Sequence, residues 1–79
     1  MNEQLDERVR EVVAETFDLD PREIGPDASA QTLAAWTSLA HLRLMANIEQ
    51  AFGLRLTMDE MTTMTNIPAI VQVLAVRDV

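Results

Sequence analysis

Cysteine is absent from this 79-residue chain, and so is lysine. Without a thiol, the chain cannot form a disulfide framework, a thiolate metal site or a cysteine nucleophile. His41 is its one histidine, which excludes histidine-rich metal sites and catalytic clusters. Six arginines oppose thirteen carboxylates, and the net charge of −7 argues against binding to nucleic acid or to an anionic membrane. A basic face on a partner protein is the natural complement.

Long apolar runs are also missing. No run approaches the roughly 18 residues that cross a bilayer. The charged start of the chain lacks the apolar segment of a secretory signal. We therefore expect a cytoplasmic protein. Its length predicts a single domain over residues 1–79 that is a monomer, too small to enclose a multi-layered active-site cleft.

What the sequence does contain is apolar residues at helical spacing. Together with cap residues, these patterns predict helices over 2–17, 38–52 and 58–63, a last helix from residue 67, and a single turn at 21–24. Gly53 supplies the stop of the second long helix. The expected fold class is all-α: a small four-helix bundle of three long helices and one short one, with a long loop between the first and second helices.

The spacing also predicts which faces are buried. Leu44, Ile48 and Phe52, with Met45 and Ala51 beside them, form the inward stripe of the second long helix. We expect this stripe to pack against residues of the first and last helices, namely Val9, Val13, Phe17, Ile70, Val71 and Leu74. Four apolar residues should hold the long loop against the helices: Leu19, Ile24, Leu33 and Trp36.

Ser38 stands at the start of the second long helix, where serine is a favoured N-cap. Three segments at consistent spacing give this position a further meaning. They are Trp36-Thr37-Ser38-Leu39, Phe52-x-x-x-Leu56, and Phe17-x-Leu19-x-x-x-x-Ile24-x-x-Asp27. As a set they resemble acyl and peptidyl carrier proteins, and the resemblance in length, helix order and loop placement covers roughly residues 5 to 76.

The resemblance implies that Ser38 is the attachment point of a 4′-phosphopantetheine arm, installed by a phosphopantetheinyl transferase. The arm's thiol holds an acyl or aminoacyl cargo as a thioester, although the chain has no cysteine. A carrier is not an enzyme. Its partners are the enzyme that loads the cargo and the downstream synthase or transferase enzymes. Ser29, the sole other serine, has no expected helix start behind it.

Two departures from the family pattern stand out. The family usually has Asp immediately before the serine, where this chain has Thr37. Fatty-acid-type carriers have a strongly acidic second helix, whereas here Glu49 is its only acid. We expect a freestanding carrier of polyketide or nonribosomal peptide biosynthesis. The alternative, favoured by Thr37, is a carrier-like helical interaction module that is never modified.

A second apolar track on the same helix is formed by Leu39, Leu42 and Ala46. We expect it to be a partner-docking patch, with Arg43 at its edge offering charge selectivity.

His41 lies three residues after Ser38 and so on the same helix face. It lacks the orienting acid and oxyanion pocket that a catalytic pair needs, so we expect a solvated histidine near the arm that could contact its phosphate. Met58, Met61 and Met64 are expected to fill gaps in the core, a lining for cargo or partner being the other interpretation.

Overall fold

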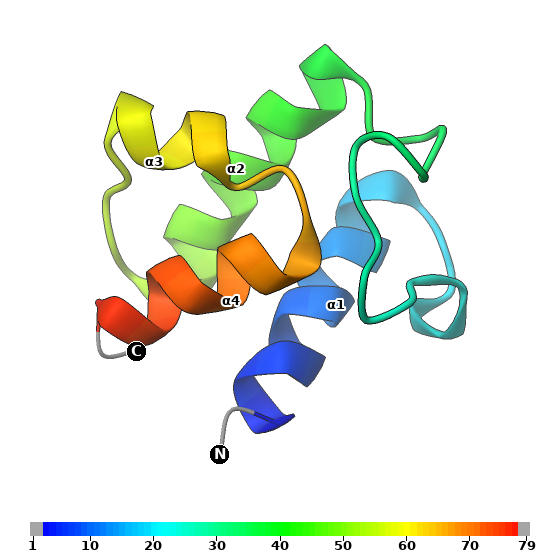
Figure 1. Ribbon diagram of the computed structural model, residues 1–79, viewed down its shortest axis with the longest axis horizontal. Coiled ribbons are helices and arrows are strands. Elements are labelled where there is room, and N and C mark those ends of the chain that lie inside the picture. Colours follow the sequence, from blue (N-terminus) through cyan, green and yellow to red (C-terminus); the bar gives the residue numbers. More distant parts are fainter. Residues whose placement is uncertain (1–2, 78–79) are drawn as a thin grey trace.

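The computed structural model describes residues 3–77, which form four α-helices and one short 3-10 turn. The helices are α1 (Glu3–Phe17), α2 (Ser38–Phe52), α3 (Met58–Thr63) and α4 (Ile67–Val76), and the turn is η1 (Pro21–Glu23). The all-α fold is confirmed, with three long helices, a short one and a long loop before α2 (Figure 1). Residue 2, where we expected the first helix to begin, lies outside the described residues.

The turn η1 and the helices α3 and α4 begin at the cap residues that the sequence indicated. Asp20 caps η1, Thr57 caps α3 through a reciprocal capping box with Glu60, and the Asn66 side chain accepts a hydrogen bond from the Ala69 amide at α4. Each cap satisfies an amide that has no partner within its own helix. Gly53 ends α2 with φ of +64°, a conformation that side chains with a Cβ rarely adopt.

The buried side chains form one cluster between the helices. The predicted inward faces of α1, α2 and α4 all contribute to it, although Phe17, Phe52 and Val71 are only partly buried at its edge. Met45, which we had placed beside the inward stripe, is fully buried, whereas Ala51 is exposed. The largest fully buried side chains are those of Val9, Val13, Ile24, Leu44, Met45, Ile48, Met64, Ile67, Ile70 and Leu74.

The long loop is held against this cluster at several points. Ile24 and Trp36 are buried, and Leu19 and Leu33 pack partly against the core, as the sequence predicted. Farther along, two backbone hydrogen bonds join the loop to the segment between α3 and α4: the Ala30 amide donates to the Thr65 carbonyl (2.9 Å) and the Ile67 amide to the Ala28 carbonyl (2.9 Å). In Figure 1 the loop lies on the right and α3 lies beside α2 at the upper left. The loop thus reaches from α1 to the α3–α4 corner.

An ion pair joins α3 to the end of α4. The guanidinium of Arg77 donates to both carboxylate oxygens of Glu60, with Nε at 3.0 Å from Oε2, and also to the Arg55 carbonyl (2.8 Å). The Arg77 hydrogen bonds, reinforced by the Thr57 amide, lower the pKa of Glu60 to about 2. Within residues 3–77, no helix combines the length and apolar character that crossing a membrane requires.

Candidate functional site

Thr37, and not Ser38, is the N-cap of α2, so our assignment of the cap was wrong by one residue. Thr37 has an extended backbone (φ −84°, ψ 174°), and its hydroxyl accepts a hydrogen bond from the Ala40 amide at 3.2 Å. Ser38 is already the first helical residue, and its side chain is exposed. Among the hydrogen bonds of the described residues, none involves the Ser38 hydroxyl. The threonine therefore carries the structural role and leaves the serine hydroxyl free.

A small pocket of about 230 Å³ lies beside Ser38. Its wall comes from three parts of the chain: the long loop, the first turn of α2 and the α3–α4 segment. The lining residues are Ala30, Trp36, Thr37, Ser38, His41 and Thr65. The backbone pairing between Ala30 and Thr65 holds two of these parts together. No pattern in the sequence predicted this pairing, because it joins backbone groups that are far apart along the chain.

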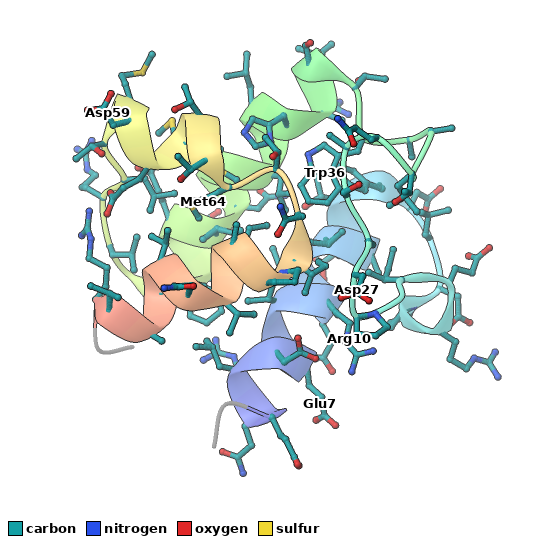
Figure 2. All side chains as sticks on the ribbon, in the orientation of Figure 1. Glu7, Arg10, Asp27, Trp36, Asp59 and Met64 are labelled. Carbon is teal, nitrogen blue, oxygen red and sulfur yellow. The ribbon has the colours of Figure 1, made fainter. Side chains whose placement is uncertain are left out.

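His41 is not the solvated histidine that we expected. Its Nδ1 accepts a hydrogen bond from the indole Nε1–H of Trp36 (3.0 Å), and its Nε2 lies 2.8 Å from the Met61 carbonyl oxygen. Figure 2 shows Trp36 directed from the loop toward the interior of the bundle, where its ring also lies 5.5 Å from that of Phe17. Because both ring nitrogens are engaged, His41 is not available to contact a phosphate on Ser38.

The hydroxyl of Ser29, unlike that of Ser38, is engaged in hydrogen bonds within the loop. Its hydroxyl lies 3.2 Å from the Thr32 hydroxyl and accepts hydrogen bonds from the amides of Gln31 and Thr32. These contacts form a local turn in the loop. The Ser29 side chain is thus used by the fold, and the Ser38 side chain is not.

The second apolar track of α2 faces solvent. Leu39 and Leu42 are 68% and 63% exposed, and Ala46 and Arg43 are exposed as well. The structure therefore places all four predicted docking residues on the surface of the helix that begins at Ser38. No acidic residue lies in the first turn of α2, so the positive end of its dipole meets no carboxylate there.

The three methionines of α3 and its end have different environments. Met64 is fully buried and Met61 packs partly against the core, as gap-filling residues would. Met58 is 76% exposed, so for this residue the core interpretation is wrong. Residues at i, i+3 and i+6 spread over about 120° around a helix, so a helix that packs on one side does not bury all three.

The described residues contain no group of three or more His, Cys, Asp or Glu side chains that could hold a metal ion. A larger hollow of about 550 Å³ lies between α1 and α4, and its lining shares no residue with the pocket beside Ser38. That hollow is lined by Asp6, Pro68, Val71, Gln72, Ala75 and Val76. It contains no serine, threonine or histidine side chain, unlike the pocket beside Ser38.

Two comparisons with known proteins give matches over most of the chain. The family model described as "Phosphopantetheine attachment site" matches residues 7–74, which include Ser38. The chain is 34% identical over 61 residues to the protein named "Polyketide-8 synthase acyl carrier protein 2" from Streptomyces avermitilis. The matched stretch covers 77% of this chain and 70% of that relative.

Proposed function

Because this chain belongs to the phosphopantetheine-bearing carrier protein family, we propose that its arm is attached to Ser38 and holds polyketide intermediates. The family match shows that the covalent group is 4′-phosphopantetheine and that the protein is a carrier and not a catalyst. The cargo is an acyl group held as a thioester on the thiol at the end of the arm. Polyketide biosynthesis is proposed because the Streptomyces relative is named for a polyketide synthase.

The observation that carries this proposal is the free, exposed hydroxyl of Ser38 at the start of α2. The transferase must reach a serine oxygen that the fold does not already use. Thr37 supplies the cap, which releases Ser38 from that role. Ser29 has no such freedom, since its hydroxyl takes part in the loop turn.

The surroundings of Ser38 also fit a phosphodiester. The first amides of a helix have no partner within the helix, and the aligned peptide dipoles concentrate positive partial charge at that end. A phosphate linked to the first residue of α2 would therefore be stabilised by α2 itself. The neutral cap Thr37 and the absence of acidic residues in the first turn leave no like charge beside it.

Leu39, Leu42, Arg43 and Ala46 are the proposed docking surface for partner enzymes. Two leucines that are about two-thirds exposed stand on the helix that begins at Ser38, so a partner that receives the arm can cover them. Arg43 supplies the charge that orients the encounter. The proposed partners are a phosphopantetheinyl transferase, an enzyme that loads the acyl group, and a synthase that consumes it.

The proposal is tested by intact-mass measurement after co-expression with a broadly acting phosphopantetheinyl transferase. We expect the wild-type chain to gain one phosphopantetheine group, the Ser38→Ala variant to gain none, and the Ser29→Ala control to be modified like the wild type. Modification of Ser38→Ala would move the site elsewhere. An unmodified wild-type chain would instead support the alternative of an interaction module. That alternative is favoured by Thr37, which stands where the family usually has Asp.

A further inference from the structure

The only histidine of the chain joins three separate segments beside Ser38. From α2, the His41 ring accepts the Trp36 indole N–H of the loop at 3.0 Å and reaches the Met61 carbonyl of α3 at 2.8 Å. His41 is half-buried, and Trp36 is almost fully buried. We call these three groups, Trp36 Nε1–H, the His41 ring and Met61 O, the His41 clip.

The neighbours of the ring fix its protonation state. An indole N–H can only donate, and a carbonyl oxygen can only accept. His41 must therefore be neutral, with its proton on Nε2 and its lone pair on Nδ1. A protonated ring, or the other neutral tautomer, would lose the bond to Trp36, because Nδ1 would then carry a hydrogen and could not accept one.

The clip acts on the part of the chain that presents Ser38. Trp36 is two residues before Ser38, and Trp36, Thr37, Ser38 and His41 all line the same pocket. The loop enters α2 through this point, with the Thr37 amide already turned back to the Ala35 carbonyl (3.0 Å). Without the bond to His41, burial of the Trp36 ring would remain, but the direction of its indole N–H and of the loop end would no longer be fixed.

We propose that His41 is a positioning residue: through the clip it holds the loop end and α3 in the one arrangement in which Ser38 meets the modifying enzyme. This inference rests on the proposed attachment of the arm at Ser38. It assigns His41 neither a catalytic role nor a phosphate contact. A partner that binds only the clipped arrangement sees its apparent affinity reduced by the fraction of molecules in which the clip is open.

Spectroscopy tests the clip without reference to modification. The chain has a single histidine and a single tryptophan, so one imidazole spin system and one indole N–H signal report on it. We expect nitrogen shifts of a neutral ring protonated on Nε2, and an indole N–H that exchanges slowly with solvent. An Nδ1-protonated ring, or an indole N–H that exchanges as fast as in a free peptide, would overturn the clip.

Substitutions then separate positioning from simple stability. His41→Gln offers no acceptor at the Nδ1 position, and Trp36→Phe removes only the donor while keeping a ring in the core. We expect each change to raise the KM of the carrier for the transferase by about two- to five-fold, the scale of one net hydrogen bond, with kcat unchanged. The double variant should be no worse than either single one, because both remove the same bond. His41→Asn, whose side-chain oxygen can accept near the Nδ1 position, should restore much of the wild-type KM.

The matched control is Thr16→Val, which removes another hydrogen bond of α2. Asn47 donates to Thr16 at 2.8 Å, about 13 Å along the helix from Ser38. This variant should melt at a lower temperature, as the clip variants do, yet keep the wild-type KM. If Thr16→Val raises KM equally, or if the clip variants leave it unchanged, His41 is only a structural residue. Failure of the proposed attachment looks different, because either the wild-type chain would take no arm or the Ser38→Ala variant would still take one.

Discussion

Two consecutive stretches of this chain differ sharply in charge. Residues 3–27 carry nine carboxylates and three arginines, whereas residues 28–48 carry a single charged side chain, Arg43, apart from the neutral His41. The first stretch forms α1 and η1, and the second forms the rest of the loop and most of α2, including Ser38. In Figure 2, Glu7, Arg10 and Asp27 lie in the lower part of the view and Trp36 lies above them.

The overall charge of −7 does not distinguish a stretch that acts through its charge from one that acts through apolar contacts. The acidic stretch repels other anions over long range. The nearly uncharged stretch leaves the proposed attachment site and its exposed leucines available for contacts that depend on shape and apolar area. The net charge of the whole chain therefore does not describe residues 28–48, the stretch in which Ser38 lies.

The largest expected effect comes from a pair of leucines on α2. Leu44 is 0% exposed and Leu42 is 63% exposed, although they are two residues apart. Leu44→Ala should lower the free energy of unfolding by about 2–5 kcal/mol, because it leaves a cavity in the core. Leu42→Ala should change it by less than about 1 kcal/mol. Denaturant titration of both variants measures the difference.

In a binding experiment, Leu42→Ala should have the larger effect and Leu44→Ala the smaller one. Leu42→Ala is expected to weaken the complex with a cognate enzyme by about 1–3 kcal/mol, the range of an interface anchor. Folded Leu44→Ala, measured at low temperature, should bind nearly as well as the wild type. Unchanged binding of Leu42→Ala would move the docking surface to the acidic stretch or to the loop.

The next effect concerns the two adjacent hydroxyls at the start of α2. Thr37→Ala removes the cap and should cost about 1 kcal/mol, whereas Ser38→Ala should leave stability close to that of the wild type. Thermal melting of the two variants side by side provides the measurement. Equal losses would mean that the cap is shared.

A smaller effect, on the rate of association with a partner, is expected from reversing Arg43, the single charge of residues 28–48. Arg43→Glu should change the association rate with a partner enzyme and its dependence on salt, with little effect on stability. Arg55→Glu makes the same change of charge just beyond the other end of α2, where it serves as the control. Stopped-flow association at low and high salt compares them. If both variants behave alike, only net charge matters and the proposed patch has no local electrostatic role.

The smallest expected effect is on the pH dependence of stability, and it comes from Glu60 and Arg77, which lie outside both stretches. The pKa of Glu60 is about 2 in the folded chain, below its ordinary value of 4.5. The unfolded chain therefore binds a proton there first, and the stabilisation that is present above pH 4.5 is lost as the pH falls toward 2. In Arg77→Gln this contribution should be much reduced. The gap in melting temperature between wild type and variant should narrow over that interval, and a constant gap would contradict the assignment.

Local patterns were sufficient for most of the fold. Apolar spacing predicted the long helices, and cap residues such as Thr57 and Asn66 marked where α3 and α4 begin. The error at the start of α2 arose because Ser and Thr are both good caps. Which of two neighbours takes the role depends on the backbone angles at the loop end, where Thr37 is extended.

The site itself was only partly predictable. Ser38 and the exposed track were found because they stand in one helix, and the resemblance gave the serine its meaning. The role of His41 depends on the Met61 carbonyl, twenty residues farther along the chain, and such a backbone acceptor leaves no trace in the sequence. The pairing of Ala30 with Thr65 was missed for the same reason.

The cap at Thr37 has a consequence for how partner enzymes distinguish the bare carrier from the arm-bearing one. If the arm is attached to Ser38 as proposed, the atom that changes covalently makes no contact that the fold depends on. The bare and the arm-bearing chains then share one architecture, and neither gaining nor losing the arm requires any part of α2 to rearrange. An enzyme that must distinguish the two forms has no altered surface to recognise, so it has to sense the arm and its cargo directly.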